Sequence, residues 1–354
     1  MNVWRLLFLC VLAALCVPRT VSALPPSDTI PDDAVCLMVV KVKSTDPGIA
    51  WILNTYKKWF MHEKLGKEVN NIVEDFNVLE FDEIAGGLLL NENGKPQYLA
   101  VGDMAKESAT VTFKYKDMNL KLKIKEREEV KGLQQGIVKA LMEQWFDDKD
   151  KYEDDGGIVI SRRRAEKGEV SVYAFVDNRV IVGTDYGLVK EAKRVSEGAL
   201  GRAGRKDIYA RFLTSVDQDT DGYLFIDNRA GYLTTFARKK ESLWHLPVLI
   251  SGDDIDALGV LFNIIDSDSA DVRAIFQGRD PAKLDLIESD ARFMAEFARR
   301  KLMLEKVDCV YDVVQRDLTV IVHFTLRNIE PYVKNLLRVD TQNGRKPPAA
   351  PMSR

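Results

Sequence analysis

The amino-acid sequence predicts an α+β protein made mainly of antiparallel sheets with flanking helices, and three local patterns carry this prediction. Apolar and polar side chains alternate along residues 110–115 and 120–125, as they do in strands with one buried face. Asn93 and Gly94 separate two apolar runs, which is a strong signal for a β-hairpin. Apolar residues recur at helical spacing over residues 49–60.

The elements of the first half can be taken in chain order. An apolar run at 34–42 forms the first strand, and Pro47 suits the first turn of the helix that follows. A second helix over 129–146 leads into a charged stretch at 147–157 that we expect to be an exposed loop. The remaining elements of this half are hairpin strands at 83–91 and 96–104, strands at 158–162, 170–175 and 180–184, and a helix at 186–197.

The second half repeats this order of strands and helices. The run from Phe81 to Leu90 resembles the run from Asp254 to Phe262, and each opens a hairpin. Two similar α+β halves that arose by duplication are therefore a hypothesis. The elements expected here are helices at 207–216, 229–240, 290–304 and 329–337, and strands at 223–227, 257–265, 272–277, 307–314 and 318–326.

Composition shifts along the chain set the boundaries between its parts. Proline is frequent near both ends of the mature chain, and glycine, arginine and alanine are frequent between the two halves. The expected parts are a signal peptide (1–23), a Pro-rich segment (24–32), a first α+β half (33–198), a linker (199–206), a second α+β half (207–338) and a disordered tail (339–354).

Residues 1–23 have the three regions of a cleavable secretory signal. Arg5 supplies the positive start, residues 6–17 are apolar, and small residues at 21–23 precede the expected cut. The alternatives are an uncleaved anchor and a lipid-modified Cys16. The later sequence has no apolar stretch long enough for a membrane-spanning helix, so we expect an exported protein of the periplasm or extracellular space without a transmembrane segment.

The mature chain is mildly acidic. Without the two arginines of the signal it holds 49 basic and 54 acidic side chains, a net charge of about −5. Nucleic-acid binding normally needs a basic surface that neutralises phosphates, so we expect no nucleic-acid partner. With 46% hydrophobic and 30% charged residues, the composition is that of a globular protein.

Cleavage of the signal leaves two cysteines, Cys36 and Cys309. In an exported protein they could form one disulfide that closes a very long loop. The alternative is two buried thiols, because both cysteines lie in apolar, strand-like runs. Spacing alone leaves both possibilities open.

The acidic segment from Asp217 to Gly222 is the one local motif with a metal-binding mechanism. Its carboxylates fall at the first, third and fifth positions of a calcium loop, and Gly222 could supply the sharp turn. The twelfth position holds Asn228 where such a loop has a bidentate glutamate, so an acidic turn that enters a strand is the alternative. The candidate calcium ligands are Asp217, Asp219, Asp221 and the backbone carbonyl of Tyr223.

The sequence contains no recognisable catalytic motif. His62, His245 and His323 have no partners at ligand spacing, and no nucleophile elbow, phosphate loop or zinc-protease helix occurs. Any catalytic residues are therefore unknown, and no cofactor other than calcium is indicated.

Residues 173–192, with the sequence YAFVDNRVIVGTDYGLVKEA, resemble a strand-turn-strand-helix module of a family of exported bacterial proteins of unknown function. The strand that begins near Asp32 and the helix-loop-strand over 207–227 are similar as well, so the likeness covers most of residues 33–338 as an order of elements. The resemblance implies an exported α+β protein and assigns no catalytic residues.

Together these observations favour a non-enzymatic exported protein that binds another envelope or extracellular component or serves as a structural scaffold. Two alternatives stay open. One is a hydrolase whose site assembles only in three dimensions, which a deep pocket with a histidine and carboxylates would favour. The other is a carrier of apolar ligands, which would need a cavity between sheet and helices.

Overall fold

The fold is taken from a computed structural model of the 354-residue chain. The residues that it describes are 25–41, 73–76, 83–104, 109–115, 118–124, 129, 132, 135–136, 139, 151–167, 169–177, 179–198, 207–217, 220–233 and 251–333. The signal, the helices predicted at 49–60 and over most of 129–146 and 229–240, the linker and the tail lie outside these residues.

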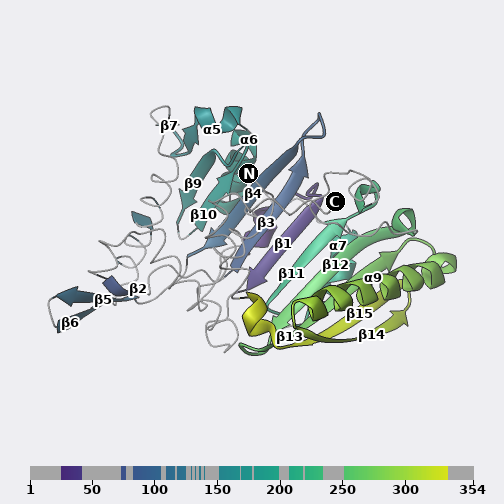
Figure 1. The fold of residues 1–354 in the computed structure, drawn as a ribbon. Coiled ribbons are helices and arrows are strands. Elements are labelled where there is room, and N and C mark those ends of the chain that lie inside the picture. Colours follow the sequence, from purple (N-terminus) through teal and green to yellow (C-terminus); the bar gives the residue numbers. More distant parts are fainter. Residues whose placement is uncertain are drawn as a thin grey trace, which may run out of the picture.

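One 12-stranded sheet forms the body of the protein, and all of its neighbouring strands are antiparallel (Figure 1). A separate sheet joins β2 (Val73–Phe76), β5 (Ala109–Tyr115) and β6 (Met118–Ile124). The strands of the large sheet, from one edge to the other, are β14 (Asp308–Arg316), β15 (Thr319–Arg327), β13 (Ser269–Gly278), β12 (Ile255–Ile264), β11 (Gly222–Asp227), β1 (Cys36–Lys41), β3 (Glu83–Leu90), β4 (Pro96–Asp103), β10 (Arg179–Gly183), β9 (Val172–Val176), β8 (Val159–Ser161) and β7 (Lys151–Glu153). This architecture confirms the predicted α+β class.

Helices pack on both faces of the large sheet. Helices α6 (Tyr186–Ser196) and α7 (Asp207–Leu213) share a core with the inner strands, whereas α9 (Leu284–Leu304) covers the opposite face of β13, β15 and β14. In Figure 1, α9 lies across β15 and β14. The shorter helices are η1 (Pro26–Thr29), α5 (Arg162–Glu166), η2 (Gly252–Asp254) and η3 (Pro281–Lys283).

The helix ends follow local capping. Asp185 accepts a hydrogen bond from the backbone N–H of Leu188 at 3.0 Å, and this fixes the start of α6. Asp280 caps η3 through the N–H of Ala282 at 2.9 Å, and α9 follows η3 directly. Helix α9 therefore begins six residues before the start that apolar periodicity predicted at residue 290.

The two halves of the large sheet have matching strand order and register. The order β1-β3-β4-β10-β9 mirrors β11-β12-β13-β15-β14, and β1 pairs with β11 at the centre. Leu37 and Phe225 face each other across this central pair. From there the directly paired residues run outward as Gly87, Leu99, Gly183 and Val172 on one side, and as Gly259, Ile275, Ile321 and Val314 on the other. This is the arrangement that the duplication hypothesis requires.

Gly87 and Gly259 occupy matching positions in β3 and β12, and both allow a close approach from the segment that precedes the central strand of their half. A methyl group at Gly87 would lie 2.5 Å from Cγ2 of Ile30, and one at Gly259 would lie 2.1 Å from Cε2 of Phe212. Both positions therefore need glycine. These are the aligned glycines of the two similar runs in the sequence.

The hairpins and their turns were predicted correctly. Asn91 accepts hydrogen bonds from the N–H groups of Asn93 and Lys95, and Gly94 has φ +67°, so the turn between β3 and β4 needs its glycine. The charged stretch at 147–157 was predicted as a loop, but part of it forms β7 at the far edge of the sheet. Within the described ranges, no helix is long and apolar enough to cross a membrane.

Candidate functional site

The seam between β1 and β11 carries a small surface pocket. Its volume is about 30 Å³, room for a single water molecule rather than an apolar ligand. Leu37 and Phe225, the pair at the centre of the sheet, form part of its wall, and the carboxylates of Asp32 and Asp227 supply its charge. The remaining lining residues are Ile30, Pro31, Ala34, Ile208 and Tyr209.

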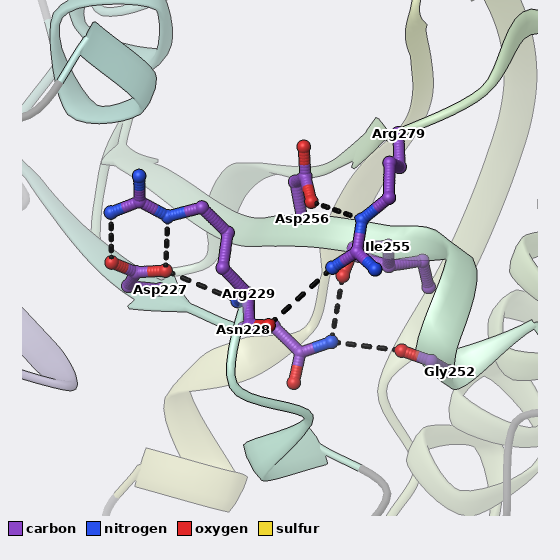
Figure 2. Close-up of polar contacts among 7 residues, drawn as sticks. All are labelled: Asp227, Asn228, Arg229, Gly252, Ile255, Asp256 and Arg279. Carbon is purple, nitrogen blue, oxygen red and sulfur yellow. Dashed lines mark hydrogen bonds and ion pairs between the residues drawn. The ribbon is translucent and has the colours of Figure 1, made fainter.

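A network of buried and half-buried polar groups surrounds the end of β11 beside this pocket (Figure 2). Asp227 receives two hydrogen bonds from the guanidinium of Arg229, at 3.0 and 2.6 Å, and one from its backbone N–H at 3.1 Å. This pairing raises the pKa of the Arg229 guanidinium. The same carboxylate therefore lines the pocket and is balanced by a fixed positive charge.

Asn228 ties this end of β11 to the next segments of the chain. Its Nδ2 donates to the carbonyls of Gly252 at 2.8 Å and Ile255 at 2.7 Å, and its Oδ1 accepts from the N–H of Leu233 at 2.6 Å. Its side chain is buried. Arg279 closes the network by an ion pair with Asp256 at 2.8 Å and by a contact of 3.5 Å to the carbonyl of Arg229. The arrangement holds the backbone in place and gathers no reactive groups.

A short repeated sequence marks this end of β11. Residues 175–179 read Phe-Val-Asp-Asn-Arg and residues 225–229 read Phe-Ile-Asp-Asn-Arg. The two copies have different structures: the first lies in the turn from β9 to β10, where Asp177 has φ +49°, whereas the second ends β11. In the first copy Arg179 forms an ion pair with Asp103 of β4.

Three of the four predicted calcium ligands, Asp217, Asp221 and Tyr223, lie among the described residues. Asp217 pairs with Arg273 of β13 at 2.6 Å, and the buried Asp221 accepts a hydrogen bond from the N–H of Ile264 at 2.7 Å. Tyr223 lies within β11, where its hydroxyl hydrogen-bonds the hydroxyl of Tyr209 at 2.6 Å. Asp219 lies outside the described residues. The segment leads into a strand, which matches the alternative of an acidic turn.

Cys36 and Cys309 are free thiols, so the disulfide offered as an alternative is absent from this structure. Cys36 lies in β1 and Cys309 in β14, with β11, β12, β13 and β15 between them. Five strand spacings of about 4.8 Å separate the two cysteines by about 24 Å, whereas a disulfide needs Cα atoms within about 7 Å. Burial raises the pKa of the Cys36 thiol to about 12 and also raises that of Cys309.

His323 is the one predicted histidine among the described residues, since His62 and His245 lie outside them. It stands on β15 between two carboxylates: its Nε2 is 3.6 Å from Asp271 of β13 and its Nδ1 is 3.6 Å from Asp312 of β14. The three side chains lie on the same partly exposed face of the sheet. In the described ranges, no group of three or more histidine, cysteine or acidic side chains is placed to hold a metal.

The sheet surface around His323 carries exposed apolar side chains. We call it the open face and define it by direct cross-strand partners on β14 and β15: Val310 with Thr325, Asp312 with His323, and Val314 with Ile321. Val310 is 72% exposed and Val314 is 40% exposed. Helix α9 packs on the opposite side of these strands.

The sequence matches no protein-family model and none of the curated proteins with which it was compared. Among solved structures, the structure of TP0453 in crystal form III aligns with a TM-score of 0.46 and 9% sequence identity, over 89% of this chain and 99% of that one.

Proposed function

We propose that this chain is an exported, non-enzymatic binding protein that docks another protein chain on the open face at the β14 edge of its large sheet. The observation that carries the proposal is the exposure of Val310, a β-branched residue that lies in an edge strand and is 72% exposed. Exposed apolar groups on an edge strand are a common feature of protein interaction sites.

The two halves of the sheet differ in what covers the matching strands β9 and β14. Val172 and Val314 occupy matching positions, yet Val172 is 2% exposed because α6 packs over it, whereas Val314 is 40% exposed. Gly183 makes the difference in the first half: a methyl group there would lie 2.8 Å from Cγ2 of Val189 in α6. Its counterpart in the second half is Ile321, whose side chain occupies the space that a helix like α6 would need.

The open face combines apolar and charged groups in the manner of a docking surface. Val310, Val314 and Ile321 supply apolar area, while His323 and Asp312 lie between them. Mixed surfaces of this kind are typical of interfaces between separately folded proteins. The signal expected at residues 1–23 and the resemblance to exported bacterial proteins support a partner in the envelope or outside the cell.

Site-specific photocrosslinking in the producing cells tests this proposal. A benzophenone amino acid replaces Val310 in one variant and Phe293 in a control variant; Phe293 is apolar, lies on α9 and is 58% exposed. We expect a discrete crosslinked protein adduct from position 310 and none from position 293. The absence of an adduct at position 310, or equal adducts at both positions, would contradict the proposal. Fractionation of the same cells tests export.

A further inference from the structure

We infer that the chain docked on this edge is a second copy of the same protein, joined by antiparallel pairing of the two β14 strands about a two-fold axis at Asp312. The inference rests on the proposed binding role of the open face and adds the identity and geometry of the partner. It would extend two 12-stranded sheets into one continuous sheet.

Strand β14 offers its backbone for such pairing. It has nine residues and pairs with β15 on one side, and none of the strands that the structure describes lies on its other side. The other edge strand, β7, has three residues. A long edge strand with exposed apolar side chains is a template for another strand. Asp308, near its start, accepts a hydrogen bond from Asn328 Nδ2, which holds the carboxylate at this edge.

The sequence of β14, Asp-Cys-Val-Tyr-Asp-Val-Val-Gln-Arg, is complementary to itself in one register. With Asp312 opposite Asp312 of the second copy, Asp308 faces Arg316 and Val310 faces Val314, and each pair occurs twice by symmetry. A shift of two residues in either direction loses both kinds of pair, because Val310 then faces Asp312 or Arg316. Opposite charges and β-branched side chains are favourable cross-strand partners.

The chain already joins its own halves in the same way. Strands β1 and β11 pair antiparallel about Leu37 and Phe225, which occupy matching positions in the two halves. An antiparallel strand pair with a local two-fold axis perpendicular to the sheet keeps each side chain on its own face. Pairing of two β14 strands would therefore place Val310 and Val314 of both copies on one continuous open face.

The centre of the proposed interface contains one unfavourable contact. The two Asp312 carboxylates face each other, and like charges directly opposite are destabilising. Asp312 lies 3.6 Å from Nδ1 of His323, and Asp271 and Arg273 of β13 are the other charged groups next to this histidine. Removal of the carboxylate at position 312 should strengthen the dimer, whereas a purely structural role would predict no gain.

Analytical ultracentrifugation of the mature chain (residues 24–354) over a range of concentrations tests the inference. We expect a concentration-dependent dimer that Val310→Lys abolishes, that Asp308→Arg weakens at least about five-fold, and that Asp312→Asn tightens about two- to five-fold. The double variant Asp308→Arg with Arg316→Asp should restore the dimer. The double variant, like Asp308→Arg alone, lacks the hydrogen bond from Asn328 to Asp308. If it dimerises again, the weakening in the single variant came from the lost cross-strand ion pair and not from a local effect on folding.

Two outcomes would overturn the inference. One is a wild-type chain that remains monomeric at all concentrations; the other is a double charge swap that stays as weak as its single variant while circular dichroism shows native folding. The mass of the adduct from position 310 separates this inference from the proposed function. An adduct with the mass of two chains supports both, whereas an adduct with a different protein overturns the second copy as partner and leaves the binding role standing.

Discussion

The guanidinium of Arg179 in β10 forms a two-point ion pair with the carboxylate of Asp103 in β4, with Nε to Oδ1 at 2.6 Å and Nη2 to Oδ2 at 2.9 Å. The two residues are direct cross-strand partners. Nη1 of Arg179 also donates to Oγ of Ser196 at the end of α6 at 3.2 Å. The Arg179 side chain therefore links the β3–β4 hairpin, the β9–β10 hairpin and helix α6.

Replacement of Arg179 by alanine should destabilise the fold strongly. The arginine side chain is only 4% exposed, and its loss leaves the Asp103 carboxylate without its counter-charge; breaking such a buried pair typically costs about 3–5 kcal/mol. Chemical denaturation measures the change. Arg300→Ala is the control, because that side chain is 75% exposed in its pair with Glu296, and its loss should cost less than about 1 kcal/mol. Equal effects of the two changes would contradict the prediction.

Replacement of Asn228 by aspartate should also destabilise the protein, although the two side chains have nearly the same shape. The change places an oxygen opposite the carbonyls of Gly252 and Ile255, to which Nδ2 now donates, and a buried unsatisfied or charged acceptor costs about 1–3 kcal/mol or more. Asn91→Asp is the matched control. Asn91 uses its Oδ1 as an acceptor, and an aspartate keeps this acceptor. The midpoint of thermal unfolding of the Asn91→Asp variant should therefore hardly differ from that of the wild type, whereas that of Asn228→Asp should fall.

Both thiols of the mature chain should be protected in the folded protein. Burial raises the pKa of both cysteines, so almost no reactive thiolate forms at neutral pH. Mass spectrometry after treatment with N-ethylmaleimide should show slow labelling of the native chain and two labels after unfolding without reductant. A single disulfide would instead block labelling until a reductant is added.

The stability of the protein should fall as the pH rises above about 9. The Cys36 thiol stays protonated in the folded state up to its pKa of about 12, whereas in the unfolded chain it ionises near 9.0. Between these values only the unfolded state releases this proton, so rising pH favours unfolding. The variant Cys36→Ala should show a flatter decline of unfolding free energy between pH 9 and 10.5 than the wild type. Equal slopes of unfolding free energy against pH in the wild type and in Cys36→Ala would contradict this effect of the Cys36 thiol.

Millimolar calcium should leave the melting temperature unchanged. Asp217 pairs with Arg273 of β13, and Asp221 accepts a hydrogen bond from the N–H of Ile264 in β12, so these contacts compete with an ion for the two carboxylates. A ligand that binds only the folded state raises its stability, so melting with and without calcium measures the effect directly. A rise that Asp219→Ala abolishes would establish the site that the acidic spacing suggested.

Local sequence patterns predicted most of the strands and turns, because alternation and turn chemistry depend on neighbouring residues. The Asn-Gly turn after β3 and the hairpin of β12 and β13 are examples. The start of α9 was missed although Leu284 and Ile287 belong to its buried apolar face, and although the Asp280 cap and Pro281 directly precede the helix. Strand β7 was missed because its side chains are all exposed, so it has no apolar pattern.

The candidate site could not be predicted in the same way, since it depends on which strands are neighbours. Nothing in the spacing of Cys36 and Cys309 shows that four strands separate them. The open face likewise depends on the contrast between Gly183, on which α6 packs, and Ile321 at the matching position. That contrast becomes visible only when the registers of the two halves are compared.

The pairing of β1 with β11 also sets an order of events during folding. Strand β1 is one of the first elements of the chain, yet one of its two neighbours is complete only at residue 227. Until that residue is available, the apolar strand Cys36–Lys41 keeps an unpaired edge that could join other chains. A chaperone that shields this strand, or a delay in folding until the second half has arrived, would protect the protein from aggregation.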